Sequence, residues 1–302
     1  MKIKCLGFLL FSASLGITAA NAQQQGEPAL ARVLYEFTHI NDTLQPDKPH
    51  KEEMVLYIGQ HASLYGSFAG ERINQQLKKQ FEDPAFDGNL TITGSGRTTP
   101  ESFYRHPVDR PFKLLHRVAG QLYLVTEDYP SIDWQIADES KDIGGYTAQK
   151  ATGWFGGRHY TAWFTTDVPF QAGPWKLHGL PGLVLEAADS RGHVAFRYAG
   201  FETLEDGIAM VAIPEHAIPS NKTALNKLVE AYKKNPQAAH HARSGAGAPS
   251  GGGGAAFSIA GSQGNTLSSI DPSRIKSINV KKDDTQVSHE TNNPLELEPE
   301  TR

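Results

Sequence analysis

The chain has 302 residues, of which 39% are hydrophobic and 9% aromatic, and its 29 basic and 33 acidic residues give a net charge of −4. These proportions are ordinary for a globular domain, and the mildly acidic balance argues against nucleic acid or an anionic membrane surface as the main partner. The only cysteine, Cys5, has no second thiol to pair with, which excludes a disulfide within the chain and a cysteine-based metal centre.

The N-terminus follows the three-part pattern of a secretory signal peptide. Two lysines give the positive start, residues 5–17 are an uncharged apolar run, and the small residues Ala20 and Ala22 occupy the positions that a signal peptidase reads. An apolar run this short does not cross a bilayer as a helix, which takes about 20 residues. We therefore expect residues 1–22 to be removed and the mature chain to carry no transmembrane segment. The expected location is the periplasm or the periphery of the outer membrane.

Alternation of apolar and polar residues predicts a series of β-strands in the domain that follows, residues 23–236. The expected strands are, in chain order, 33–38, 54–58, 112–118, 121–126, 146–155, 158–165, 183–188, 193–201 and 208–213. Gly156-Gly157 suits the positive φ that a two-residue hairpin requires, and Ala119-Gly120 and residues 189–192 mark two further hairpins. Strands joined by such short turns pair antiparallel.

Two amphipathic helices are expected beside these strands. In residues 71–82 apolar side chains recur every four positions and form one stripe. Residues 223–234 form the second helix, with Asn221 as its N-cap. The predicted fold class is mainly β within α+β: an antiparallel curved sheet or half-barrel packed on one or two helices.

Residues 237–302 differ in composition from the domain before them. They are rich in glycine, serine and charged residues, and Phe257 is their only aromatic residue. Such a segment buries too little apolar surface to offset its ordering entropy, so a flexible, disordered tail is expected. Residues 274–280 have a strand-like pattern, but the composition around them favours the disordered tail.

The most distinctive stretch is residues 173–186, which read GPWKLHGLPGLVLE. Pro181 fixes φ for the second position of a turn, and Gly182 supplies the positive φ that a type II turn needs at the next position. Gly173 and the proline after it predict a second turn. The stretch is therefore predicted to form two turns around a short apolar segment that leads into the strand beginning at Leu183.

The second of these turns resembles the signature of the GLPGLI family of exported Bacteroidetes proteins. The matching turn residues are Gly179, Leu180, Pro181 and Gly182, and Val184 stands in place of the final isoleucine. Further blocks in the family's order, such as KDIGGY at 141–146 and FGGR at 155–158, extend the clear resemblance over roughly residues 132–185. The resemblance implies a bacterial envelope protein, often encoded near outer-membrane receptors and transporters, and it implies no established catalytic activity.

Five side chains are candidates for binding a ligand or a partner: Arg158, His159, Trp163, Trp175 and His178. Arg158 begins a strand and suits either a clamp for an anion or a cross-strand ion pair. Alternation places His159 and Trp163 on the opposite face of that strand. His178 either faces a ligand or packs its ring in the core, and Trp175 belongs to a group of aromatic residues that either fill the core or line a pocket.

Sequence patterns of catalysis are missing. There is no GxSxG nucleophile motif, no P-loop, no Rossmann fingerprint and no HExxH pair. No cofactor and no metal are therefore expected, although a metal site assembled across strands from His159, His178 or His193 stays open. Whether the chain is an enzyme is uncertain, and the sequence leans against it.

The favoured function is a non-enzymatic ligand-binding or carrier module for an apolar or peptide-like ligand. One alternative is an interaction subunit that docks on an outer-membrane receptor or transporter. The least favoured is a hydrolase that uses Arg158 and His178.

Overall fold

The computed structural model describes residues 26–94, 98–106, 111–205, 207–235, 272–282, 287–288 and 290–297. The predicted signal peptide lies outside these residues, as does the first part of the predicted tail, up to residue 271. The helices and strands are, in chain order, β1 (Glu27–Pro28), β2 (Ala31–His39), β3 (His50–Ile58), β4 (Ser63–Ser67), α1 (Ala69–Glu82), β5 (Asn89–Gly94), β6 (Glu101–Arg105), β7 (Phe112–Val118), β8 (Gln121–Glu127), β9 (Gln135–Ile143), β10 (Tyr146–Phe155), β11 (Arg158–Thr165), β12 (Leu183–Asp189), β13 (Val194–Thr203), β14 (Met210–Val211), β15 (Ile218–Ser220), α2 (Lys222–Lys234), a short 3₁₀ helix (Pro272–Arg274) and β16 (Ser277–Lys282).

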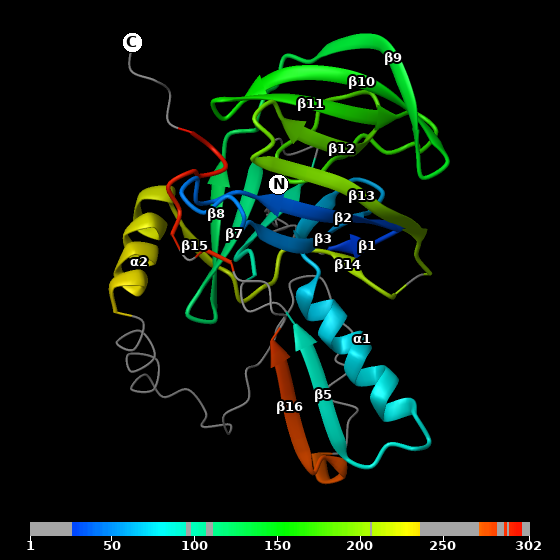
Figure 1. The fold of residues 1–302 in the computed structure, drawn as a ribbon, viewed down its shortest axis with the longest axis vertical. Coiled ribbons are helices and arrows are strands. Elements are labelled where there is room, and N and C mark those ends of the chain that lie inside the picture. The colour runs from blue at the N-terminus through cyan, green and yellow to red at the C-terminus, as the bar shows by residue number, and fades with distance from the viewer. Residues whose placement is uncertain are drawn as a thin grey trace, which may run out of the picture.

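Twelve strands form one sheet, in the order β15-β8-β7-β6-β4-β3-β2-β13-β12-β11-β10-β9. Neighbouring strands are antiparallel except β15 and β8, which run parallel. The sheet curves and stays open, because its edge strands β9 and β15 do not pair with each other (Figure 1). The predicted fold class is confirmed: the protein is mainly β, with a curved, largely antiparallel sheet packed against helices.

The alternation in the sequence agrees with the burial of the side chains. In β2, Val33, Tyr35 and Phe37 are buried and face the main core, and the residues between them are more exposed. The hairpins predicted at Ala119-Gly120 and Gly156-Gly157 are present, and all four residues have positive φ. The sequence pattern misses β9 because most of its side chains are exposed and do not alternate, and only two residues of the predicted strand 208–213 form β14.

Both predicted helices are present. The side chain of Asn221 accepts a hydrogen bond of 2.9 Å from the backbone N–H of Ala224, which confirms it as the N-cap of α2. Leu225 is buried against the main core, and α2 lies beside the sheet near β7 and β8 (Figure 1). No helix among the described residues is long and apolar enough to cross a membrane.

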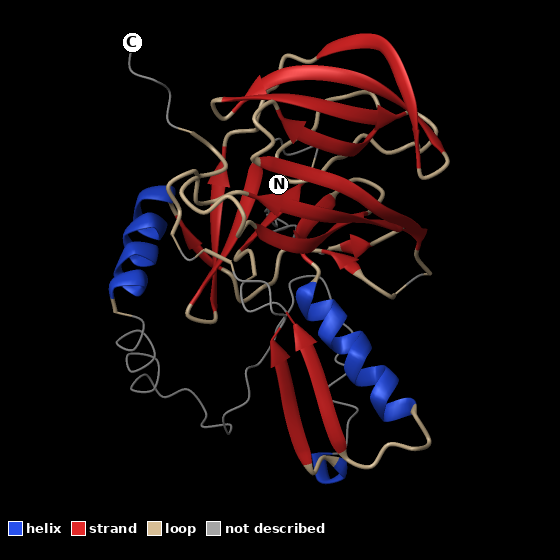
Figure 2. Cartoon of the chain, viewed as in Figure 1, coloured by secondary structure: helices blue, strands red, loops and turns tan. Residues whose placement is uncertain are grey.

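Helix α1 and the parallel pair β5–β16 form an arm that projects from the sheet (Figure 2). Gln76 and Gln80 of α1 each exchange two hydrogen bonds with the backbone of β5, at Thr93 and Thr91 respectively. The two side-chain amides therefore act as a third strand and satisfy the edge of β5 that faces the helix.

The structure corrects the prediction of a continuous disordered tail in two places. Residues 277–282 form β16, which pairs with β5. Residues 287–288 and 290–297, which we call the strap, lie against the main sheet near α2 and the β10–β11 turn (Figure 1). Composition underestimates order here because hydrogen bonds and ion pairs hold the strap, whereas the compositional argument counts only apolar burial.

Candidate functional site

Residues 173–186, which we call the signature stretch, fill the core beneath the sheet. Leu177, Leu180, Leu183 and Val184 are at most 2% exposed. The hydroxyl of Tyr35 in β2 donates a hydrogen bond of 2.7 Å to the backbone oxygen of Val184, which ties the stretch to the centre of the sheet. The signature is therefore a packing element, and its apolar residues are not available for docking.

The predicted type II turn at Pro181-Gly182 is wrong. The positive φ belongs to Gly179, at 98°, and Gly182 does not adopt the left-handed conformation. Gly182 is required for its size, because a Cβ there would lie 2.1 Å from the backbone oxygen of Thr165. Close approach of the signature to β11 leaves no room for a side chain, so packing rather than turn geometry selects the glycine.

Trp175 has a φ of 53°, which bulky residues rarely adopt. Its ring is buried, stacks on Phe196 at a centroid distance of 6.3 Å and meets Phe155 edge-on at 5.4 Å. Backbone strain of about 1–3 kcal/mol is expected for such a residue, and it persists because the packing leaves the ring no other place.

Arg158 lies in a buried ion pair at the start of β11. Its Nη1 donates to Asp189 Oδ2 of β12 at 2.8 Å, and both side chains are 1% exposed. The second carboxylate oxygen of Asp189 accepts from the backbone N–H groups of His193 and Val194 at 2.7 and 2.9 Å. The cross-strand ion pair expected as one alternative for Arg158 is therefore present, and both oxygens of the carboxylate accept hydrogen bonds.

The remaining donors of Arg158 hold the strap. Nη2 donates to Asn293 Oδ1 at 2.7 Å and to Pro294 O at 2.6 Å, and Nε donates to Leu295 O at 3.0 Å. The backbone oxygen of Asn293 also lies 2.7 Å from His39 Nε2. Arg158 thus clamps carbonyl oxygens of a distant segment rather than a free anion.

The loop between β2 and β3 holds the other half of the strap. Asn41 Nδ2 donates to the backbone oxygens of Ser288 and Glu290 at 3.0 and 2.6 Å, and Asn41 O accepts from the backbone N–H of Asn292 at 3.0 Å. Asp42 accepts from the Ser288 hydroxyl and from Asn292 Nδ2, both at 2.8 Å. The hydrogen bond from Ser288, with others, lowers the pKa of the Asp42 carboxyl.

Lys176, inside the signature stretch, anchors the far end of the strap. Its Nζ lies 2.6 Å from Glu296 Oε1 and 2.9 Å from Glu127 Oε2 of β8. Burial alone would lower the pKa of Lys176, but hydrogen bonds to Glu296 and Glu127 outweigh it and raise that pKa. The backbone N–H of Leu297 donates to Gly156 O at 2.8 Å, which brings the strap onto the β10–β11 turn.

We call the residues that hold the strap the strap site: His39, Asn41, Asp42, Arg158 and Lys176. They come from β2, the β2–β3 loop, β11 and the signature stretch. Sequence reasoning singled out only Arg158, because the others lie in polar loops or inside a motif that looked apolar. No local sequence pattern predicts these residues, because what they share is contact with a segment far along the chain.

A second group of residues, separate from the strap site, lines a small cavity of about 10 Å³ between the inner face of the sheet and the signature stretch. Its wall includes Tyr65 of β4, Arg105 of β6, Trp175 and His178. Burial, and to a lesser extent the charge of Arg105, lowers the pKa of His178 to about 3. His178 is therefore neutral at neutral pH, with its ring 4.5 Å from that of Tyr129.

His159 and Trp163 lie on the opposite face of β11 from Arg158, as the alternation predicts. The ring of His159 lies 5.2 Å from that of Trp154, which is 69% exposed, and Lys141 Nζ lies 4.5 Å from the Trp163 ring. The five candidate residues therefore do not form one site. His159 and His178 lie apart as well, and the described residues contain no group of three His, Cys, Asp or Glu side chains placed to hold a metal ion.

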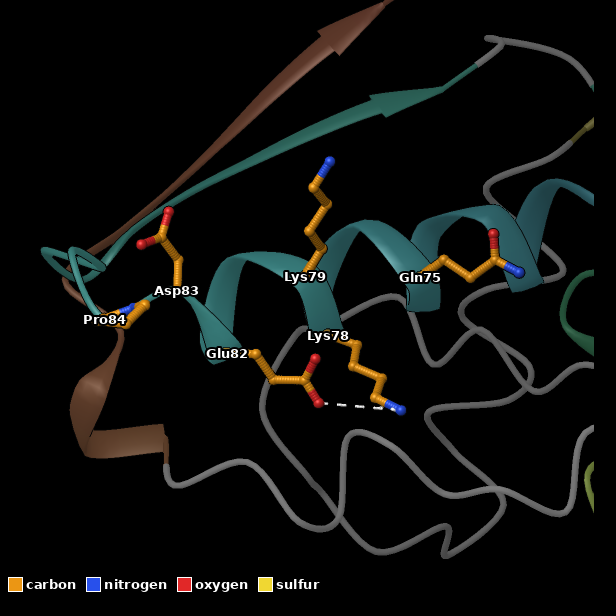
Figure 3. Close-up of a pocket in the computed structure, with 6 residues that line it drawn as sticks. All are labelled: Gln75, Lys78, Lys79, Glu82, Asp83 and Pro84. Atoms are coloured by element: carbon orange, nitrogen blue, oxygen red, sulfur yellow. Dashed lines mark ion pairs between the residues drawn. The ribbon is translucent and has the colours of Figure 1, made fainter.

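A wider hollow of about 470 Å³ lies along α1 and is lined by Gln75, Lys78, Lys79, Glu82, Asp83 and Pro84. In Figure 3, Lys79 and Asp83 point to one side of the helix and Lys78 and Glu82 to another, where they pair at 3.9 Å. The charged side chains do not converge on a common point. This hollow is a feature of the arm's surface and not a candidate site.

A family model described as a protein of unknown function (Porph_ging) matches residues 157–186, which run from the β10–β11 turn through the signature. No curated protein matches the chain. Two solved structures of PNGF-II, in space groups P21 and C2, are similar with TM-scores of 0.44 and 0.45 and 12% identity. Each comparison covers 66% of this chain and 32% of the PNGF-II chain, so the chain spans about a third of that protein's length.

Proposed function

We propose that the protein is an exported, non-enzymatic interaction module that binds a polypeptide segment of an envelope partner at the strap site. The observation that carries this proposal is the way Arg158 is used. It makes three hydrogen bonds to a segment that lies 135 to 137 residues further along the chain. A site that holds a distant segment mainly through its backbone oxygens has the chemistry of a peptide-binding site.

The anchor of the bound segment is an asparagine. Asn293 is 4% exposed, and both polar atoms of its side-chain amide are hydrogen-bonded. Oδ1 accepts from Arg158, and Nδ2 donates to Ile40 O at 2.6 Å. A site built from such buried polar groups discriminates strongly against a residue that lacks one of them. The strap continues with Pro, Leu and Glu, and the glutamate meets Lys176. The proposed ligand is therefore a peptide with an Asn-Pro anchor followed by an acidic residue.

An apolar carrier, the function favoured by the sequence, is less well supported. Pockets for small molecules usually measure about 300–1,000 Å³, far more than the roughly 10 Å³ between the sheet and the signature. A hydrolase that uses Arg158 and His178 is also poorly supported, because the Arg158 guanidinium is taken up by Asp189 and the strap.

A binding measurement with the strap supplied as a separate peptide tests the proposal. The protein is the full mature chain carrying Asn292→Ala and Asn293→Ala, which weaken its own strap, and the probe is a fluorescent peptide of residues 287–297. We expect saturable binding by fluorescence anisotropy, and at least about tenfold weaker binding of a peptide with alanine in place of Asn293. Equal binding of both peptides, or none to a variant that circular dichroism shows to be folded, contradicts the proposal.

Export and membership of the GLPGLI family belong to the same proposal. The signal-peptide pattern and the match of residues 157–186 to a family model support them. Expression in a Gram-negative host followed by N-terminal sequencing of the periplasmic fraction should give a chain beginning at Gln23. Recovery only of a cytoplasmic chain beginning at Met1 would refute export.

A further inference from the structure

The small cavity behind the signature stretch is lined by buried polar groups without hydrogen-bond partners. They are the Tyr65 hydroxyl, Arg105 Nε and His178 Nε2. Tyr65 and His178 are 3% and 4% exposed. A buried polar group without a partner costs about 1–3 kcal/mol, so three around one cavity are a strong sign of a ligand.

All three groups can donate a hydrogen bond. Tyr65 has a hydroxyl proton, Arg105 Nε carries an N–H, and a neutral His178 donates from Nε2 in one of its two tautomers. None of them needs to accept. A ligand that only accepts hydrogen bonds therefore satisfies the whole set.

Arg105 also supplies an uncompensated charge. Its Nη1 donates to the backbone oxygen of Gln171 and its guanidinium lies 5.6 Å from the Tyr129 ring, but it forms no ion pair with a described residue. The nearby carboxylate of Glu52 is engaged by His50 and by Thr99, and Lys176 is neutralised by Glu127 and Glu296. The cavity therefore has one positive charge on its wall, that of Arg105, which forms no ion pair with a described residue.

We propose that this cavity is a binding site for one small monovalent anion of about the size of a halide, held by Arg105, Tyr65 and His178. The volume of about 10 Å³ fits one water-sized particle and excludes larger organic anions. A bound anion satisfies three buried donors and balances Arg105. It also joins β4, β6 and the signature stretch, and so stabilises the packing of the signature under the sheet.

Unfolding of the full mature chain in sodium chloride and in sodium gluconate of equal ionic strength tests the site. Chloride is only slightly larger than the single water-sized particle that the cavity holds, and gluconate is many times larger, so chloride should give a saturable rise in Tm of about 5 °C over gluconate. Tyr65→Phe and Arg105→Gln should each remove most of this difference. Arg72→Gln, which changes an exposed arginine paired with Glu53, serves as the matched control and should keep it.

A direct measurement accompanies the unfolding curves. The ³⁵Cl resonance should broaden with the wild-type protein and with Arg72→Gln, and should stay narrow with Arg105→Gln. Equal Tm in both salts together with a narrow resonance shows that water alone occupies the cavity and overturns the proposal. A chloride effect that persists unchanged in Tyr65→Phe and Arg105→Gln shows a general salt effect and overturns it as well.

Discussion

His178 should make the stability of the protein depend on pH. Burial lowers its pKa from 6.5 in the unfolded chain to about 3 in the folded protein. Between these values the unfolded chain binds a proton and the folded protein does not, so the free energy of unfolding falls as the pH drops from 6.5 toward 3. Between pH 7 and pH 4, the free energy of unfolding of His178→Gln should fall by about 3 kcal/mol less than that of the wild type. Urea unfolding of both proteins in gluconate at each pH measures this free energy. If it falls by the same amount in both proteins, the prediction is contradicted.

The Arg158–Asp189 pair should be costlier to break by removing one partner than by removing both. Arg158→Ala leaves the buried Asp189 carboxylate without its cation, which costs about 3–5 kcal/mol in such pairs. The double variant Arg158→Met with Asp189→Leu removes both charges and should recover part of that loss, because the backbone N–H groups of His193 and Val194 and the strap oxygens still lose their partners. Chemical unfolding of the three proteins decides the matter, since a single substitution costing under about 1 kcal/mol would mean that the pair is not sealed from water.

At the scale of elements, the contact between the signature stretch and β11 should be intolerant of one methyl group. Gly182→Ala places a Cβ 2.1 Å from Thr165 O, so we expect a loss of about 3 kcal/mol or more in the free energy of unfolding. Gly94→Ala is the control, because the nearest atom to its Cβ is Ile73 Cδ1 at 4.0 Å, and it should change stability by at most about 0.5 kcal/mol. Similar losses in both variants would refute the close-packing explanation of the signature.

Elements with strong local patterns were predictable from the sequence. Strands β2 and β11 alternate, the Gly156-Gly157 turn needs positive φ, and Asn221 stands one residue before its helix. Two strands that were not predicted owe their order mainly to strand pairing. β9 is exposed and shows no alternation, and β16 pairs with β5 although the composition around its strand-like pattern favours a disordered tail.

The candidate site was much less predictable than the fold. Arg158 is a candidate because it begins a strand, where its charge suits an anion clamp or a cross-strand ion pair, and the ion pair was one of these two expected roles. Asn41, Asp42 and Asn293 carry no local signal, because their hydrogen bonds join segments more than 240 residues apart. The positive φ of Trp175 was also unpredictable, since it is imposed by packing and opposed by the residue's own preference.

At the scale of the whole molecule, the strap joins parts that the sheet topology keeps separate. It contacts the β2–β3 loop, the start of β11, the β10–β11 turn and Lys176 of the signature stretch. The strap follows the arm strand β16 in the chain, so arm and strap are consecutive in sequence but lie on different parts of the protein (Figure 1). If a partner segment replaces the strap, β16 loses the hold on the sheet that the strap provides, which couples binding to the position of the arm.

Hydrogen exchange in the intact wild-type protein tests the central claim most directly. The backbone amides of Asn292, Asn293 and Leu297 donate to Asn41 and Gly156, so they should exchange slowly in the protein alone. Because a tethered strap has an effective concentration in the millimolar range, unlabelled peptide 287–297 at ~10 mM should compete with it. These three amides should then exchange faster while the amides of β2 stay protected, and a peptide with alanine in place of Asn293 should have no effect. Unchanged protection of the strap at every peptide concentration would show that the strap is a fixed part of the fold and that the strap site binds no partner.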